Sequence, residues 1–276
     1  MIDLHTHTTA SDGRCTPSDL VARAAAAGIE VLSVTDHDTT AGCETALQAC
    51  KAAGIDFVPG IEITAVVEGA DVHVLGYFID ARSAALQAFL GEQRRGRVDR
   101  VHEMVHRLSE HGIQLDADAI LQPALDDPLK SAGRPWIARA LVAGGHVTDV
   151  NEAFRRWLQR GRPAFVPRRG PRPEEVFDRI HEAGGLASLA HPVLVRHDEW
   201  IPDFARSGLD ALEAYHSDHD DAVTRRYIEM AARLGLALSG GSDYHADDLH
   251  GATRPGAVSL PREAYDELKS RRKRLT

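Results

Sequence analysis

Short apolar runs alternate along the chain with longer stretches that have helical patterns. The runs have the usual length of a buried strand, and we predict strands at residues 31–35, 57–61, 72–75, 186–190, 209–215 and 236–239. The stretch from Pro17 to Ala27 is rich in alanine, and Gly28 follows it at the position that commonly ends a helix. Strands that alternate with helices in this way indicate βαβ units, so the pattern predicts an α/β fold with a mainly parallel sheet.

Residues that bind metals follow most of the predicted strands. His5 and His7 lie two residues apart, so on an extended segment their imidazoles project from the same face and can chelate one ion. Asp12, in the turn after them, adds a carboxylate oxygen. The other candidates within or after predicted strands are Asp36, His37, Asp38, Glu62, His73, His191, Asp243 and His245. One such histidine is usually a satisfied polar group, but their repetition predicts a shared site at the carboxyl ends of barrel strands.

These motifs together resemble the polymerase and histidinol phosphatase (PHP) family of metal-dependent phosphoesterases. The resemblance rests on five ordered motifs: His5-Thr6-His7, Thr35-Asp36-His37-Asp38, Gly60-Ile61-Glu62, Ala190-His191-Pro192 and Ser242-Asp243-Tyr244-His245. It implies an irregular (β/α) barrel of seven strands. Within the family, the chain is most similar to enzymes that remove the 3'-phosphate from nucleoside 3',5'-bisphosphates, such as adenosine 3',5'-bisphosphate. Related members act as 5'-3' exonucleases on short RNA.

The family pattern also implies a set of metal ligands and two to three divalent cations. It assigns the first cation to His5, His7, Glu62 and Asp243. Glu62 then bridges to a second cation held by His73 and His191, and a third cation lies between Asp12, His37 and His245. Many members have histidine in place of Asp12, and the carboxylate favours a harder cation. We therefore expect manganese, with zinc, iron or magnesium as alternatives.

This ligand set predicts hydrolysis of a phosphate ester. Two cations about 3.5–4 Å apart can lower the pKa of a bridging water and clamp the attacking and leaving oxygens. A hydroxide formed there would attack phosphorus. We expect Asp243 to orient this nucleophile or accept its proton, and His191 or His245 to protonate the leaving oxygen.

The central stretch differs from the rest of the chain. Residues 88–170 show helical patterns broken by glycine and proline, and they contain 14 Lys or Arg against 10 Asp or Glu. Since the chain as a whole has a net charge of −9, the remainder carries −13. We predict a barrel formed by residues 1–87 and 171–276, and a helical insertion at 88–170 that acts as a basic lid over a phosphorylated substrate.

Two basic clusters in this insertion are candidates for binding a second phosphate. Lys130, Ser131 and Arg134 combine a point charge, a hydroxyl and a guanidinium that can bind phosphate through two N–H groups. Arg169, beside Arg168, is the second candidate, and a solvated basic loop is the alternative for both clusters. We expect His216 to line the substrate pocket without binding metal.

The insertion also contains a pattern typical of zinc proteases. His102 and His106 flank Glu103 in an H-E-x-x-H arrangement, which on a helix places both imidazoles on one face. However, Val101, Val105 and Leu108 follow the spacing of a buried helical stripe, and a third ligand is missing nearby. We therefore expect this helix to pack against the protein rather than bind zinc.

Composition and charge limit the cellular compartment and the class of substrate that we expect. The chain begins without a signal-like segment and has no apolar run near the roughly 18 residues of a membrane span, so we expect a cytoplasmic protein with no membrane contact. Its three cysteines predict no disulfide framework. The net charge of −9 favours a small nucleotide, or at most short RNA, over long nucleic acid. No protein partner is indicated. The remaining alternatives are a histidinol-phosphate phosphatase and a non-catalytic metal or nucleotide sensor.

Overall fold

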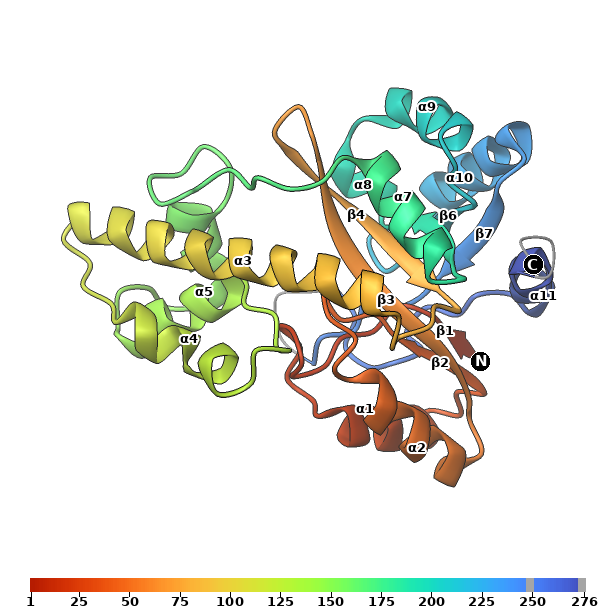
Figure 1. Ribbon diagram of the computed structural model, residues 1–276, viewed down its shortest axis with the longest axis horizontal. Coiled ribbons are helices and arrows are strands. Elements are labelled where there is room, and N and C mark those ends of the chain that lie inside the picture. The colour runs from red at the N-terminus through yellow and green to blue at the C-terminus, as the bar shows by residue number, and fades with distance from the viewer. Residues whose placement is uncertain (247–250, 273–276) are drawn as a thin grey trace.

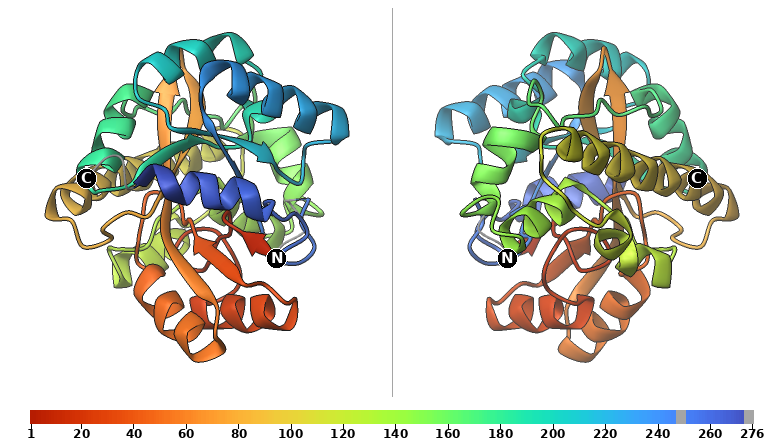
Figure 2. Two further views of the ribbon diagram at one scale, coloured as in Figure 1. Left: turned by 90° about the vertical axis from the view of Figure 1, so that its right-hand side faces the viewer. Right: turned by 90° about the vertical axis from the view of Figure 1, so that its left-hand side faces the viewer.

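The computed structural model describes residues 1–246 and 251–272. Within these residues, seven strands form one nearly closed barrel surrounded by helices (Figures 1 and 2), which confirms the predicted fold class. The strands are β1 (Ile2–Asp3), β2 (Val31–Val34), β3 (Asp56–Val67), β4 (Ala70–Tyr77), β5 (Leu186–Leu189), β6 (Ala211–Tyr215) and β7 (Ala237–Gly240). They are neighbours in the same order as in the chain.

The helices fall into those that cover the barrel and those that extend from it. The first group is α1 (Pro17–Ala26), α2 (Cys43–Ala53), α7 (Pro173–Glu182), α8 (Pro192–Val195), α9 (Ile201–Arg206), α10 (Asp221–Leu234), α11 (Arg262–Arg272) and the 3₁₀ helix η2 (Asp198–Trp200). The second group is α3 (Ala84–Glu110), α4 (Ala117–Asp126), α5 (Arg134–Ala143), α6 (Val150–Ala153) and the π-helix η1 (Phe154–Leu158). None of these described helices is long and apolar enough to span a membrane.

The sheet is mainly parallel, with one reversed strand. β1, β2 and β3 are parallel, as are β5, β6 and β7, but β4 runs antiparallel to both of its neighbours. β3 and β4 are joined by Glu68 and Gly69, whose φ angles of 49° and 74° suit a tight hairpin turn. The apolar pattern predicted strands here, but it did not predict that the chain reverses without a crossover helix.

The barrel is completed by backbone contacts between the first and last motifs. The His5 carbonyl accepts from the Asp243 amide at 2.8 Å, and the Tyr244 carbonyl accepts from the His7 amide at 2.9 Å. Gly241 permits this approach, because a Cβ on it would lie 2.3 Å from the His5 nitrogen. The residues after β1 and β7 are thereby held side by side.

Buried side chains form one core inside the barrel and another beneath its helices. Leu4, Leu75 and Tyr77 fill the interior. Tyr265 and Leu268 belong to α11, which closes the end of the barrel opposite the α3–η1 extension (Figure 2). β2 is buried along its whole length because the interior covers one face and helices cover the other. The open end of the barrel is therefore left for polar side chains.

The α3–η1 extension has a core of its own. Met104, Leu108, Trp136, Ile137 and Leu158 are buried together there, away from the barrel (Figure 1). The first turns of α3 pack in the barrel core instead, so the helix runs continuously through residue 88, where we predicted a domain boundary. His102 and His106 are exposed on α3, while the apolar positions between and after them are buried.

Candidate metal centre and anion pocket

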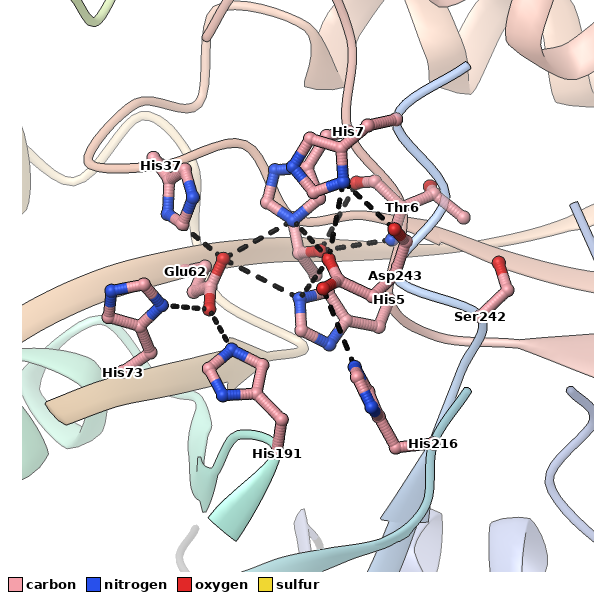
Figure 3. A network of polar contacts seen from close by, with 12 residues as sticks. His5, Thr6, His7, His37, Glu62, His73, His191, His216, Ser242 and Asp243 are labelled. Carbon is pink, nitrogen blue, oxygen red and sulfur yellow. Dashed lines mark hydrogen bonds and ion pairs between the residues drawn. The ribbon is translucent and has the colours of Figure 1, made fainter. Parts of the chain in front are cut away.

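The predicted ligands converge at the open end of the barrel (Figure 3). They come from six places: the segment after β1 (His5, His7, Asp12), the end of β2 (His37), β3 (Glu62), β4 (His73), the end of β5 (His191) and the segment after β7 (Asp243, His245). Groups of three or four of their ligand atoms lie within 4.8 Å of one another. Most of these side chains are buried, and only His37 and His73 are partly accessible.

Glu62 lies at the centre of this arrangement. Its Oε2 atom is 2.9 Å from His37 Nδ1 and 3.2 Å from His7 Nε2, and its Oε1 atom is 2.8 Å from His73 Nδ1 and 3.0 Å from His191 Nε2. The sequence placed Glu62 at a strand end, but β3 continues for five residues beyond it, to Val67. The hairpin with β4 extends the strand, and it brings His73 beside Glu62 from the neighbouring strand.

Asp243 and Asp12 complete two further groups. Asp243 Oδ1 lies 3.3 Å from His5 Nε2 and 3.2 Å from His7 Nε2. Asp12 lies 3.6 Å from His37 Nε2 and 3.3 Å from His245 Nε2, through its two carboxylate oxygens. Each carboxylate thus faces two imidazoles, an arrangement that suits a cation placed between them.

Several buried polar atoms support this interpretation. His5 Nε2, His7 Nε2 and Glu62 Oε2 have no hydrogen-bond partner among the described residues. Leaving a buried polar atom without a partner costs about 1–3 kcal/mol. Coordination to a divalent cation would satisfy them, and mixed imidazole and carboxylate ligands suit zinc, iron and manganese. The residues present therefore fit a cluster of divalent cations.

The charges of the site favour cations as well. Burial alone would raise the pKa of Glu62, Asp243 and Asp12, but the surrounding imidazoles outweigh it and hold each pKa well below its usual value. Burial lowers the pKa of His7, but Asp243 and Glu62 outweigh this effect and raise it to about 9. Without a cation, these carboxylates therefore favour a proton on His7. Cation binding releases such protons.

Glu213 on β6 is a functional residue that the sequence analysis missed. Its two oxygens accept from His5 Nδ1 at 2.9 Å and from the His191 amide at 2.6 Å, so one buried carboxylate orients two predicted ligands. Such a carboxylate also makes the imidazole a better ligand. The signal in the sequence was a single acidic residue inside the apolar run Ala211–Tyr215.

A cavity of about 160 Å³ adjoins the metal centre. Its lining includes Asp12, His37 and His73 from the barrel and four arginines from the central part of the chain, which are Arg97, Arg100, Arg134 and Arg168. The sequence analysis named Arg134 as a candidate among these, and Arg168 only as the neighbour of Arg169. Arg97 and Arg100 were missed, because basic residues on a helix are usually solvated.

The structure places four other predicted substrate-binding residues outside this cavity. Lys130 lines a separate hollow with Arg94 and Arg95, and Arg169 is exposed although its neighbour Arg168 is buried and faces the cavity. Ser131 is buried and its amide donates to the Ala10 carbonyl, so it supports the segment after β1. His216 is also buried, 3.4 Å from Asp243, so it does not line the pocket.

Residues 3–170 match the PHP domain. The chain belongs to the PHP family. This membership confirms the resemblance drawn from the five motifs, and the seven-stranded barrel agrees with it.

Relatives with known names align along nearly the whole chain. The chain is 34% identical to a 3',5'-nucleoside bisphosphate phosphatase of Chromobacterium violaceum, covering 98% of this chain and 97% of that one. It is 36% identical to a 5'-3' exoribonuclease of Haemophilus influenzae, covering 88% and 89%. A Bifidobacterium adolescentis protein assigned as a metal-dependent phosphoesterase has a crystal structure that superposes with a TM-score of 0.88 at 32% identity, covering 98% and 96%.

Proposed function

We propose that the protein is a metal-dependent phosphohydrolase that removes the 3'-phosphate from nucleoside 3',5'-bisphosphates. The observation that carries this proposal is the shared cavity, whose lining combines three predicted metal ligands with four arginines. A substrate with two phosphates can present one to each side. The Chromobacterium relative, whose name specifies this substrate class, supports the choice.

The proposal assigns the cations to the ligand groups already described. His5, His7, Glu62 and Asp243 would hold one, Glu62, His73 and His191 a second, and Asp12, His37 and His245 a third. Bound there, divalent cations would lower the pKa of a coordinated water and neutralise charge on the phosphate. Manganese is our proposed ion, since carboxylates and imidazoles are mixed in every group.

The protein's own side chains would orient the reactants. Asp243 remains ionised because neighbouring imidazoles hold its pKa well below the usual value, so it can accept a hydrogen bond from the attacking water. His191 and His245 flank the centre and are the proposed donors to the leaving oxygen. These three side chains are buried, which limits competition from bulk water for these contacts.

The arginines of the cavity would anchor the phosphate that is retained. Arg100 Nη2 has no hydrogen-bond partner among the described residues, and Arg134 approaches Asp71 only to 3.8 Å. Both guanidinium groups therefore have N–H groups available for phosphate oxygens. Asp71 lies two residues before His73 on β4, about 6.8 Å along the strand, so the strand fixes the distance between the anchor and the metal centre.

Two other substrates are alternatives. A short oligoribonucleotide could place its 5'-phosphate in the same anchor, and the exoribonuclease from Haemophilus supports this possibility. Histidinol phosphate has a single phosphate and would leave the arginine cluster without an anion. For either nucleotide class we keep the cytoplasm as the proposed compartment, because nucleotides are made and consumed there.

The anchor can be tested by pairing a substitution with a change of substrate. Arg134→Ala should lower kcat/KM for adenosine 3',5'-bisphosphate by about 2–4 kcal/mol, which corresponds to about 30- to 1000-fold. It should have little effect on adenosine 3'-monophosphate, which lacks the anchored phosphate and should already be a poor substrate. Arg169→Ala is the matched control, because this exposed arginine lies outside the cavity. Equal losses of kcat/KM on both substrates would exclude the anchor.

A further inference from the structure

His216 has the surroundings of one more metal ligand. It follows β6, is 2% exposed, and forms a close group with His5 and Asp243. Its Nε2 atom lies 3.4 Å from Asp243 Oδ2, on the side of that carboxylate away from His7 (Figure 3). The position alone does not distinguish a ligand from a residue that orients a ligand.

The other ring nitrogen of His216 decides between these roles. The Asp218 backbone N–H donates to His216 Nδ1 at 3.1 Å, so Nδ1 uses its lone pair and carries no proton. A neutral imidazole with a bare Nδ1 carries its proton on Nε2. A metal ligand must offer a lone pair on the nitrogen that faces the cation. His216 Nε2 has none to offer in this tautomer.

Two predicted ligands have the opposite arrangement. His5 Nδ1 lies 2.9 Å from the Glu213 carboxylate, and His245 Nδ1 lies 2.8 Å from the Asp243 backbone carbonyl. Both partners are acceptors, so each Nδ1 carries the proton and each Nε2 presents a lone pair towards the metal centre. The same residue type is thus held in different tautomers according to the group behind the ring.

We propose that His216 is a positioning residue that donates from Nε2 to Asp243 Oδ2, and that it binds neither metal nor substrate. This inference rests on the proposed function, because it assumes that Asp243 Oδ1 faces a cation. A separation of 3.4 Å is longer than a closed N–H···O bond of about 2.9–3.0 Å, and a small rotation of the carboxylate closes it.

The role of this donor is to select one oxygen of Asp243. An ionised carboxylate can offer either oxygen, or both, to a cation. A fixed N–H group on Oδ2 leaves Oδ1 for the cation and for the attacking water. Groups that orient ligands in this way typically change metal affinity or activity by about 10- to 100-fold when removed.

The tautomer can be measured directly on zinc-loaded protein labelled with ¹⁵N-histidine. Long-range ¹H–¹⁵N spectra distinguish protonated, bare and metal-bound ring nitrogens, and His216→Gln identifies the signals of this ring. We expect a protonated Nε2 and a bare Nδ1 for His216. A metal-bound or unprotonated Nε2 would overturn the proposal. This result does not depend on which phosphate ester the enzyme hydrolyses.

Two substitutions then test the role in the working enzyme. His216→Leu removes the donor, whereas His216→Gln keeps an amide N–H near the position of Nε2. With manganese in excess, we expect Leu to lower kcat about 10- to 100-fold at unchanged metal content, and Gln to recover most of the loss. His219→Leu is the control, since this nearby ring bonds the Ala214 carbonyl and lies outside the ligand groups.

Two outcomes would count against the role of His216, and a third would count against the substrate proposal alone. Loss of one equivalent of manganese in both variants would make His216 a ligand. Equal kcat values for Leu, Gln and the unaltered protein would make it a packing residue. If no variant and no unaltered protein hydrolysed the bisphosphate, the substrate proposal would fail, while the spectra and metal content would still decide the role of His216.

Discussion

Glu62 contacts more of the metal centre than any other single residue described here. Both of its oxygens face imidazoles, and one oxygen has no hydrogen-bond partner among the described residues. Neighbouring imidazoles hold its pKa well below the usual value despite burial, so it is ionised across the physiological range. In the proposed metal centre this carboxylate would bridge two cation positions, and its charge would contribute to both.

Glu62→Gln should therefore lower metal content and turnover together. The amide keeps the size of the side chain but loses the negative charge. Removing a residue that only hydrogen-bonds to a metal ligand typically costs up to about 100-fold, and we expect kcat to fall by more than that here. Metal analysis of purified protein and steady-state kinetics with added manganese would measure both quantities. A variant with full metal content and normal turnover would show that Glu62 does not bridge.

At the scale of secondary-structure elements, Asp38 connects the barrel to the extension. Its Oδ2 atom accepts from Arg97 of α3 and from Arg168, each at 2.6 Å, and its Oδ1 atom accepts from the Thr64 amide at 3.0 Å. Burial would raise the pKa of Asp38, but the two arginines outweigh it and hold the pKa far below its usual value. Asp38 directly follows His37, so the same turn positions a predicted ligand and two arginines of the cavity.

Asp38→Asn should reduce the free energy of unfolding by about 3 kcal/mol at neutral pH, because it leaves two buried guanidinium groups without their counter-charge. The folded pKa is depressed, so the stabilisation is present above the unfolded value of about 4 and is lost as pH falls below it. Urea unfolding of both proteins between pH 7 and pH 3 would measure the difference. A difference that stayed constant, or grew, at acid pH would contradict this account.

Helix α3 gives the contrasting case of histidines outside the site. His102 and His106 are exposed, and His106 approaches Glu110 to 3.7 Å on the helix surface. Replacing both with alanine should leave metal content unchanged and phosphatase activity within about twofold, since exposed substitutions away from special features rarely exceed about 0.5 kcal/mol. Loss of a stoichiometric zinc ion from the double variant would restore the zinc-protease interpretation.

For the whole molecule, the order of strands and ligand motifs could be read from the sequence. Apolar runs followed by His, Asp or Glu predicted the barrel and the residues that gather at its open end, because period and residue type are local signals. The β3–β4 reversal depended on two turn residues, Glu68 and Gly69, and was not predicted. Arg97 and Arg100 are recognisable as cavity residues only in the folded protein, where they line the same cavity as His37 and His73 of the barrel.

The residues that contact the predicted ligands from behind could not be predicted from the sequence either. Glu213 pairs with His5, which lies 208 residues earlier, and His216 lies beside Asp243, which follows the next strand, β7. Pairs between separate strands leave no periodic pattern in the sequence. Backbone geometry was hidden as well: His191 and Asp243 have φ angles of 27° and 54°, a region that costs non-glycine residues about 1–3 kcal/mol. Such strain persists where tertiary contacts determine the conformation, which sequence patterns do not report.

The most direct test of the proposed function is the identity of the product formed from adenosine 3',5'-bisphosphate by the unaltered protein. With manganese present, we predict adenosine 5'-monophosphate and inorganic phosphate, separated by chromatography, and no turnover after chelation until manganese is restored. Accumulation of adenosine 3'-monophosphate would reverse the assignment of the two phosphates to the metal centre and the arginine anchor. Undiminished turnover in the presence of chelator would contradict the metal-dependent mechanism itself.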